Sequence, residues 1–372
     1  MNRKTRVAVL YGGKSGEHEV SLKSAASVLR YLDRERFEPV PISIDKQGRW
    51  QCHDLRRIEV ANTESLPIPA DSPAIRLEPQ GDLTAILPSD SAAPPIPPVD
   101  VVFPVIHGPL CEDGAMQGLL ELAGAAYVGS GVLASAVGMH KDIAKRLAAL
   151  AGLPVAPYLA LSRRDYRRDP EGAAKAASEA LTLPVFVKPC NMGSSVGVHK
   201  VKRWEDLDAA LADAFQYDLK VLVEQGIDAR EIEIAVLDGD PPVASVASEL
   251  NAGPQHEFYS YEAKYIDQDG ATVDLPAKLD AAQMERVRKL AIDAFVALEC
   301  SGLARVDFFL DRQSGAFYFN EINTLPGFTA ISMYPKMMEA SGLPYPALLT
   351  RLIELAQERH AERAGLKTDY EG

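Results

Sequence analysis

The sequence predicts an α/β protein that has a largely parallel N-terminal sheet and more than one domain. The first observation is the order strand, glycine loop, helix, strand over residues 7–44, which is typical of an α/β unit. The second is a change beyond residue 221 to longer strands joined by turns. The third is the length of 372 residues, because one hydrophobic core rarely serves more than about 250–300 residues. We therefore expect two or three domains.

The first expected domain covers residues 1–125. Short apolar runs alternate in it with a helix that Ser21 can cap, and a proline-rich stretch at 65–98 is typical of a surface excursion. The expected elements are strands at 7–10, 40–44 and 101–106 and helices from Ser21 and at 114–123.

The second and third expected domains cover residues 126–220 and 221–372. The polar stretch 251–274 has few apolar positions in register, so we expect a mobile loop that can act as a lid. The other expected elements are helices at 139–150, 280–299 and 345–358 and strands at 185–187, 198–201, 304–310 and 316–323.

Composition excludes several classes of protein. The net charge is −13 and no basic stripe with interleaved aromatic residues is present, so we expect no nucleic-acid partner. The first apolar run is too short for a signal peptide or a membrane span. The four cysteines are far apart and form no CxxC pair, which argues against structural zinc and disulfides. We expect a cytoplasmic protein that does not bind membranes.

The hairpin at residues 304–323 carries the strongest chemical signal. Arg305 and Asp307 share one face of the first strand, and Glu321 and Asn323 share one face of the second. Folding about the turn brings the two pairs side by side. Two carboxylates and an amide oxygen suit Mg²⁺, and an arginine beside them suits a site where negative charge develops. Surface ion pairs are the alternative, but apolar residues flank these positions.

Two neighbouring features suit anion binding. The turn TLPG lets the N–H of Gly327 point into the same site, although a Pro-Gly pair is also common in plain turns. Lys188 ends an apolar strand, where its charge is costly unless an anion meets it. The loop after this strand offers backbone N–H groups and the hydroxyls of Ser194 and Ser195 to a phosphate.

The N-terminal half contributes two candidates. The glycines at residues 12–16 fit neither a P-loop nor a dinucleotide motif, but they place Glu17 at the mouth of the sheet, near a helix N-terminus. His107 ends a strand, where it is either a site residue or a satisfied structural histidine. No Ser-His-Asp or Cys-His set stands out, which disfavours nucleophilic hydrolysis.

These segments together resemble the D-alanine–D-alanine ligases of the ATP-grasp superfamily over essentially the full length. The matching segments include VLYGGKSGEHEVSL, VIHGPLCEDGAMQG, FVKPCNMGSSVGV, FYSYEAKY and FNEINTLPGFTAISMYP. The resemblance implies a three-domain ATP-grasp fold with an N-terminal Rossmann-like domain. It also implies ATP-dependent formation of D-alanyl-D-alanine through D-alanyl phosphate, for peptidoglycan precursors, with two Mg²⁺ or Mn²⁺ ions. Cys111 stands where the family commonly has glycine, so the loop around it is expected to be remodelled if that glycine needs a positive φ.

The resemblance implies a role for each candidate residue. Glu17 and His107 would hold the first substrate, Ser332 and Met333 the carboxylate of the second, and Arg305 and Gly327 the oxyanion of the reaction. Ser194 and Tyr265 would hydrogen-bond toward Glu17 and latch the lid. The remaining residues would bind ATP (Lys141, Lys188, Ser194, Ser195, Glu224, Glu231, Lys264) and the metal (Asp307, Glu321, Asn323).

Three alternatives stay open. A D-alanine–D-lactate ligase of the same fold is the nearest, and Tyr265 in EAKY favours the dipeptide by resemblance. Another ATP-grasp ligase, similar to glutathione synthetase, would share only the ATP site. An ATP-sensing protein without turnover would lack Arg305 or the metal carboxylates, and all are present. The resemblance also implies a homodimer.

Overall fold

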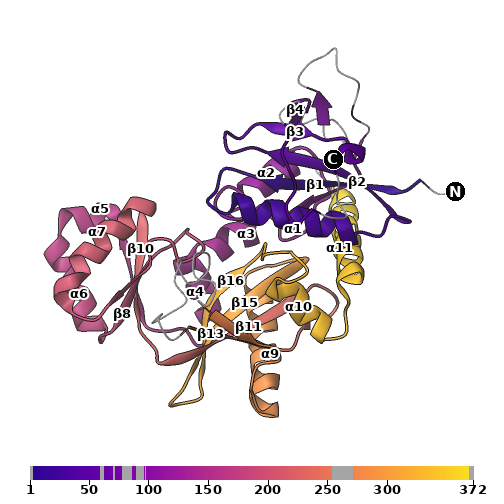
Figure 1. The fold of residues 1–372 in the computed structure, drawn as a ribbon. Helices are drawn as coiled ribbons and strands as arrows, with labels where there is room; N and C mark the ends of the chain where they lie inside the picture. The colour runs from indigo at the N-terminus through magenta and orange to yellow at the C-terminus, as the bar shows by residue number, and fades with distance from the viewer. Residues whose placement is uncertain are drawn as a thin grey trace.

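The computed structural model describes residues 3–58, 63–69, 72–77, 86–88, 96, 98–253 and 271–367. In this described part, three larger sheets form three lobes (Figure 1). No helix in it is long and apolar enough to cross a membrane. The N-terminal, central and third sheets follow one another along the chain, as the sequence predicts, while the division at 125/126 and 220/221 stays a prediction.

The N-terminal sheet has the order β3-β2-β1-β6. β1 (Thr5–Gly12) is parallel to its neighbours, because a helix crosses between it and β2, and its side chains from Arg6 onward are buried. The predicted strands and parallel pairing are confirmed. The sheet and the small hairpin beside it comprise β2 (Phe37–Ile44), β3 (Trp50–Cys52), η1 (Leu55–Arg57), β4 (Ile75–Leu77), β5 (Ile86–Pro88) and β6 (Val101–Pro104).

Helix α1 (His18–Tyr31) begins earlier than the sequence predicts. The prediction that Ser21 caps this helix is wrong, because Glu17 occupies the N-cap position and Ser21 lies inside the first turn. The Ser21 hydroxyl accepts a hydrogen bond from the Gly12 N–H at 2.8 Å and donates one to the Val105 carbonyl at 2.6 Å. Ser21 thus joins the helix to β1 and to the end of β6.

The central sheet has the order β7-β10-β8-β9. β10 (Lys220–Gln225), most of which the expected boundary at 220/221 assigns to the third domain, pairs with β7 and β8 of this sheet. Helices α5, α6 and α7 gather in the same lobe (Figure 1). α2 (Ala115–Leu122) instead packs on the N-terminal sheet, and α4 (Lys141–Leu150) packs on the third sheet (Figure 1). The other elements of this stretch of chain are α3 (Val132–Met139), β7 (Tyr158–Ser162), α5 (Arg163–Arg168), α6 (Pro170–Ala180), β8 (Val185–Pro189), β9 (His199–Val201), η2 (Trp204–Asp206) and α7 (Leu207–Tyr217).

The third sheet has the order β14-β13-β11-β15-β16, with β12 beside β11. The described ends of the expected lid at 251–274 are paired strands, because β13 pairs with β14 from Ala252 and Ala271 outward. This part comprises β11 (Ala229–Leu237), β12 (Val243–Ala244), β13 (Ser248–Ala252), β14 (Ala271–Asp274), α9 (Ala281–Ala297), β15 (Leu303–Asp311), β16 (Phe317–Asn323), α10 (Met333–Ala340) and α11 (Tyr345–Ala364).

The last helix returns to the first sheet (Figure 1). Leu348, Leu352 and Ile353 of α11 are fully buried in one apolar cluster with Val7 of β1 and Val101 of β6. The chain therefore closes on its own N-terminal lobe, which brings the lobes together around a common cavity.

Candidate active site

A cavity of about 1140 Å³ is lined by residues from all three lobes. Glu17 and His107 reach it from the N-terminal lobe, Lys188 from the central lobe, and Arg305 and Asp307 from the third. The structure also brings the remaining described candidates to this cavity (Lys141, Ser194, Ser195, Glu224, Glu231, Glu321, Asn323, Gly327, Ser332, Met333). Lys264 and Tyr265 lie outside the described residues.

The hairpin of β15 and β16 brings the two predicted pairs side by side. Arg305 lies opposite Asn323 and Asp307 opposite Glu321, and all four face the cavity. The side chains between them in the sequence, such as Val306, are buried in the core of the third lobe, because alternate residues of a strand face opposite sides. The polar face is therefore part of a cavity and not a solvated surface.

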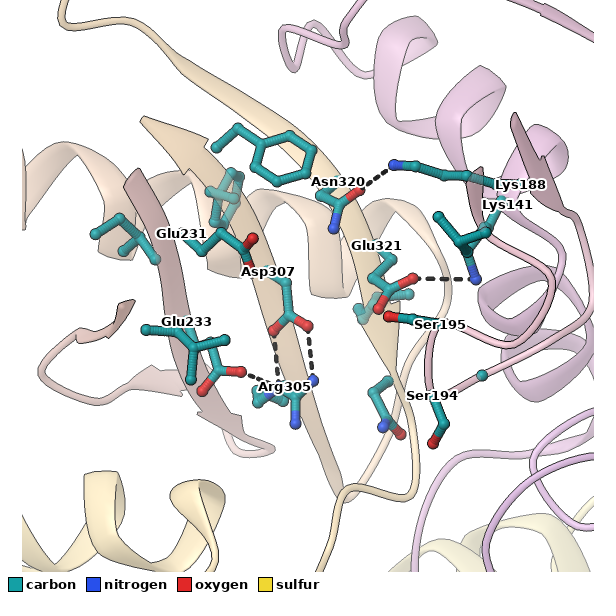
Figure 2. A pocket seen from close by; sticks show the side chains of 18 of the residues that line it. Lys141, Lys188, Ser194, Ser195, Glu231, Glu233, Arg305, Asp307, Asn320 and Glu321 are labelled. Atoms are coloured by element: carbon teal, nitrogen blue, oxygen red, sulfur yellow. Dashed lines mark hydrogen bonds and ion pairs between the residues drawn. The ribbon is translucent and has the colours of Figure 1, made fainter. Parts of the chain in front are cut away.

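Arg305 is held by carboxylates on two strands (Figure 2). Its Nε and Nη2 donate to the two oxygens of Asp307 at 2.8 and 2.7 Å, and Nε lies 3.4 Å from Glu233 Oε1 on β11. Burial alone would lower the pKa of Arg305, but Asp307 and Glu233 outweigh it and raise that pKa well above its usual range. The guanidinium is permanently charged and fixed in direction.

The carboxylates around Arg305 are crowded. Burial raises the pKa of Asp307 to about 7, and Glu233 and Glu321 add to the rise while Arg305 opposes it. A further cation would relieve this crowding. Asp307, Glu321 and Asn323 offer the hard oxygen atoms that Mg²⁺ prefers. The described residues contain no group of three or more His, Cys, Asp or Glu side chains that could hold a metal ion by themselves.

Two lysines on the opposite wall already meet anionic groups. Lys141 Nζ, at the start of α4, lies 3.1 Å from Glu321 Oε2 and donates to the Met192 carbonyl at 2.9 Å. Lys188, at the end of β8, donates to Glu224 and lies 3.4 Å from Asn320 Oδ1. Figure 2 shows both lysines pointing across the cavity toward the hairpin. Both lysine ammonium groups are thus paired with carboxylates in this structure.

Glu224 sits between two lysines in the wall of the cavity. Its Oε1 lies 2.5 Å from Lys145 Nζ in a buried ion pair that lacks hydrogen-bond alignment, and its Oε2 meets Lys188. Burial alone would raise the pKa of Glu224, but Lys145 and Lys188 lower it to about 2. Glu224 is therefore ionised at neutral pH.

The loop after β8 has an unusual backbone. Ser194 and Ser195 have φ of 54° and 58°, in the left-handed region that non-glycine residues rarely adopt. Such a turn points successive N–H groups the same way and forms an anion-binding concavity. The Ser194 hydroxyl also donates to Glu17 Oε1 at 2.6 Å, so the expected contact between these two residues is present. Strained backbone of this kind is characteristic of functional loops.

Glu17 packs closely against the loop that follows β6. A Cβ on Gly108, which has a φ of 83°, would lie 2.9 Å from Glu17 Oε2, so only glycine fits there. Cys111 is not among the residues with a positive φ, whereas its neighbour Leu110 has a φ of 71°, and the expected remodelling of this loop stays a prediction. Cys111 is a buried free thiol in this loop.

The turn after β16 offers backbone donors. Gly327 lines the cavity, and no described residue accepts a hydrogen bond from its N–H. Ser332 is the N-cap of α10, and no side chain caps the N–H groups of that first turn. Uncapped N–H groups at a helix N-terminus bind carboxylates well.

Three polar residues of the site were not predicted. For two of them the sequence carried a signal that was missed. Lys145 lies four residues after Lys141 on a helix, and Glu233 lies two residues after Glu231 on a strand, so each shares a face with a candidate. Asn320 has no such signal. A register shift between Asp307 and Phe308 leaves it as the extra residue of a β-bulge, which turns its amide toward Lys188 (Figure 2).

Comparisons with known proteins agree over the whole chain. Residues 6–130 match the family described as D-ala D-ala ligase N-terminus, and residues 147–354 match D-ala D-ala ligase C-terminus. A D-alanine–D-alanine ligase A from Bradyrhizobium diazoefficiens is 66% identical over 100% of both chains, and one from Escherichia coli is 47% identical over 98% of this chain and 99% of its own.

Solved structures give the same picture. A D-alanine–D-alanine ligase from Coxiella burnetii superposes with a TM-score of 0.81 at 38% identity, covering 97% of this chain and 96% of that one. A D-Ala:D-Ser ligase from Enterococcus faecalis superposes with a TM-score of 0.82 at 35% identity, covering 95% and 100%. The predicted ATP-grasp architecture is therefore confirmed.

Proposed function

The chain belongs to the D-alanine–D-alanine ligase family, and from this premise we propose a reaction and a role for each residue of the site. The reaction is the ATP-dependent joining of two D-alanine molecules to D-alanyl-D-alanine, a peptidoglycan precursor. A carboxylate is a poor electrophile, so the first D-alanine is converted to an acyl phosphate, whose phosphate is a good leaving group.

ATP lies between the central and third lobes. Lys141 and Lys188 exchange their carboxylate partners for phosphate oxygens, and the N–H groups around Ser194 and Ser195 surround the same phosphates. Glu224 and Glu231, which both line the cavity, are the residues at the adenine and the ribose. Lys264, known from the sequence alone, meets the γ-phosphate.

Asp307, Glu321 and Asn323 would hold Mg²⁺, or Mn²⁺, with two ions expected in all. The fit rests on the crowded carboxylates, whose mutual repulsion a divalent cation removes. When bound, the metal neutralises charge on the phosphates being transferred. Arg305, directed by Asp307 and Glu233, supplies a further fixed positive charge at the same place.

The first D-alanine binds with its ammonium group on Glu17. Ser194 holds that carboxylate in place, and His107 borders the same pocket. A carboxylate oxygen of this substrate attacks the γ-phosphorus of ATP, and the bond between that phosphorus and the β,γ-bridging oxygen breaks to release ADP. The products of this step are D-alanyl phosphate and ADP.

The second D-alanine places its carboxylate on the first turn of α10, at Ser332 and Met333. Its amine loses a proton and attacks the acyl carbon. Arg305 and the Gly327 N–H stabilise the resulting oxyanion, and the carbonyl re-forms as inorganic phosphate leaves. Tyr265, by sequence alone, is the latch that favours an amine nucleophile over a hydroxyl.

The observation that carries this proposal is the convergence of Arg305, Asp307 and Glu321 with Lys141 and Lys188 across one cavity. Phosphate release is measured with D-alanine alone, with L-alanine, and with D-alanine plus D-lactate or D-serine. We expect turnover with D-alanine and none with L-alanine, and mixed products should stay minor. A main product containing D-lactate or D-serine would contradict the proposed specificity.

Because the enzyme consumes ATP, we place it in the cytoplasm, and we propose a homodimer.

A further inference from the structure

The turn that carries Gly327 is hydrogen-bonded by side chains of the N-terminal lobe. Ser24 is fully buried on α1 and does not line the cavity. Its hydroxyl oxygen lies 3.2 Å from His107 Nε2. The same oxygen accepts a hydrogen bond from the Phe328 N–H at 3.4 Å. On its other side, His107 Nδ1 donates to the Leu325 carbonyl at 3.1 Å.

These contacts form one connected relay. The imidazole donates from Nδ1 to a carbonyl, so neutral His107 presents an unprotonated Nε2 to the Ser24 hydroxyl, which donates to it. The Ser24 oxygen keeps lone pairs for the Phe328 N–H. If the imidazole is protonated, Nε2 donates to the same oxygen instead, and the geometry is unchanged.

The two anchored groups bracket Gly327. The Leu325 carbonyl lies two residues before it, and the Phe328 N–H belongs to the next residue. The Tyr345 hydroxyl adds a 2.6 Å bond to the Phe328 carbonyl from the C-terminal helix. The orientation of the Gly327 peptide is therefore fixed by groups on both sides, and an error of about 1 Å in such a donor can cost roughly 100-fold in rate.

We propose that Ser24 is a positioning residue for the second chemical step. It sets the direction of the Gly327 N–H directly through Phe328 and indirectly through His107. The inference rests on the proposed oxyanion role of Gly327. It assigns the first helix a part in catalysis beyond the carboxylate of Glu17, and it makes the oxyanion donor depend on contact between the N-terminal and third lobes.

The test compares Ser24→Ala with a matched control. Like Ser24, Ser245 is fully buried, does not line the cavity, accepts one backbone N–H at 3.0 Å and donates one bond at 2.7 Å; its partners, Ala235 and Val246, lie outside the turn that carries Gly327. The kcat at saturating D-alanine, the ATP Kd and the Tm are measured for the full chain. We expect Ser24→Ala to lower kcat between about 10-fold and 100-fold while the ATP Kd changes less than about twofold. Ser245→Ala should lower Tm similarly and keep kcat near wild type.

Equal kcat values for the two variants, with active wild type, would overturn the role of Ser24 and leave the proposed function intact. Absence of dipeptide from wild type would instead remove both. A double-mutant cycle with His107→Gln tests the relay itself. We expect the combined loss in kcat to be smaller than the product of the single losses, because both variants release the same turn. Losses that multiply fully would show that Ser24 does not act through His107.

Discussion

At the scale of single residues, three cationic side chains of the cavity are paired with carboxylates of the protein itself. Asp307 binds Arg305, Glu321 lies 3.1 Å from Lys141, and Glu224 meets Lys188. In the proposed reaction, Lys141 and Lys188 exchange these carboxylates for phosphate oxygens, while Asp307 keeps Arg305 directed. The site is thus preorganised for anions, which lowers the reorganisation needed at the moment of reaction.

Arg305→Lys tests the directional part of this arrangement. Lysine keeps the charge but loses the planar fork that meets Asp307 with two bonds. We expect kcat to fall at least roughly 100-fold, the usual scale for removing an oxyanion donor, with little change in the ATP Kd. Arg351→Lys, on the outside of α11, is the control and should behave like wild type. Near-normal turnover of Arg305→Lys would mean that the arginine has only a structural role.

Ser194→Ala tests the contact with Glu17. The variant keeps the loop backbone but removes the 2.6 Å hydrogen bond to a carboxylate, which is worth about 1.5–3 kcal/mol. We expect the KM for the first D-alanine to rise about tenfold or more. Ser178→Ala, an exposed serine of α6, serves as the control. An unchanged KM in steady-state kinetics would remove Ser194 from the proposed site.

At the scale of elements, the hairpin shows what the sequence can and cannot predict. Alternation of polar and apolar residues predicted the shared face of Arg305 and Asp307, and the short turn predicted that this pair lies beside Glu321 and Asn323. The exact register was not predicted, because the bulge sets it. The bulge at Asn320 had no signal, because an extra residue in one strand depends on the partner strand. The mistaken cap at Ser21 has a similar cause, since its hydroxyl bonds to β1 and to the residue after β6.

The buried group of Glu224, Lys145 and Lys188 joins β10, α4 and β8, and it predicts a pH dependence of stability. The folded pKa of Glu224 is lowered from 4.5 to about 2, so its contribution is complete above pH 4.5 and is lost as the pH falls toward 2. Glu224→Gln should reduce the free energy of unfolding by about 3–5 kcal/mol at pH 7, because two buried lysines lose their partner.

Urea unfolding of wild type and Glu224→Gln at pH 7, 5 and 3.5 measures this difference. We expect it to be constant between pH 7 and 5 and smaller at 3.5. Glu339→Gln, an exposed residue of α10, is the control and should show no comparable loss. A difference that grows on acidification would contradict the depressed pKa.

At the scale of the whole molecule, the C-terminal helix α11 packs against the N-terminal sheet. α11 buries Leu352 and Ile353 against β1 and β6 of the first sheet, although the sequence separates these elements by more than half of the chain. Its amphipathic pattern predicted a helix at 345–358 but not the surface that it covers, because periodicity identifies an apolar face and not its partner. The lobes that line the cavity are thus tied together by both ends of the chain.

Leu352→Ala tests this closure. Leu352 is fully buried, and truncating such a leucine costs about 2–5 kcal/mol through lost burial and the cavity left behind. We expect a lower urea midpoint of unfolding, and we expect the N-terminal lobe to lose its protection against amide hydrogen exchange at a lower urea concentration than in wild type. Leu366→Ala, which truncates a leucine that is 69% exposed, should stay within about 0.5 kcal/mol of wild type. Equal stabilities would show that α11 is not needed for the first lobe.

The central claim is a ligase in which the γ-phosphoryl group of ATP activates one D-alanine for attack by another. The direct measurement is the product balance with D-alanine and Mg-ATP, by chromatography of nucleotides, phosphate and dipeptide. We predict one ADP and one phosphate for each D-alanyl-D-alanine, without AMP or pyrophosphate. AMP as the main nucleotide product, or ADP released without dipeptide, would contradict this account.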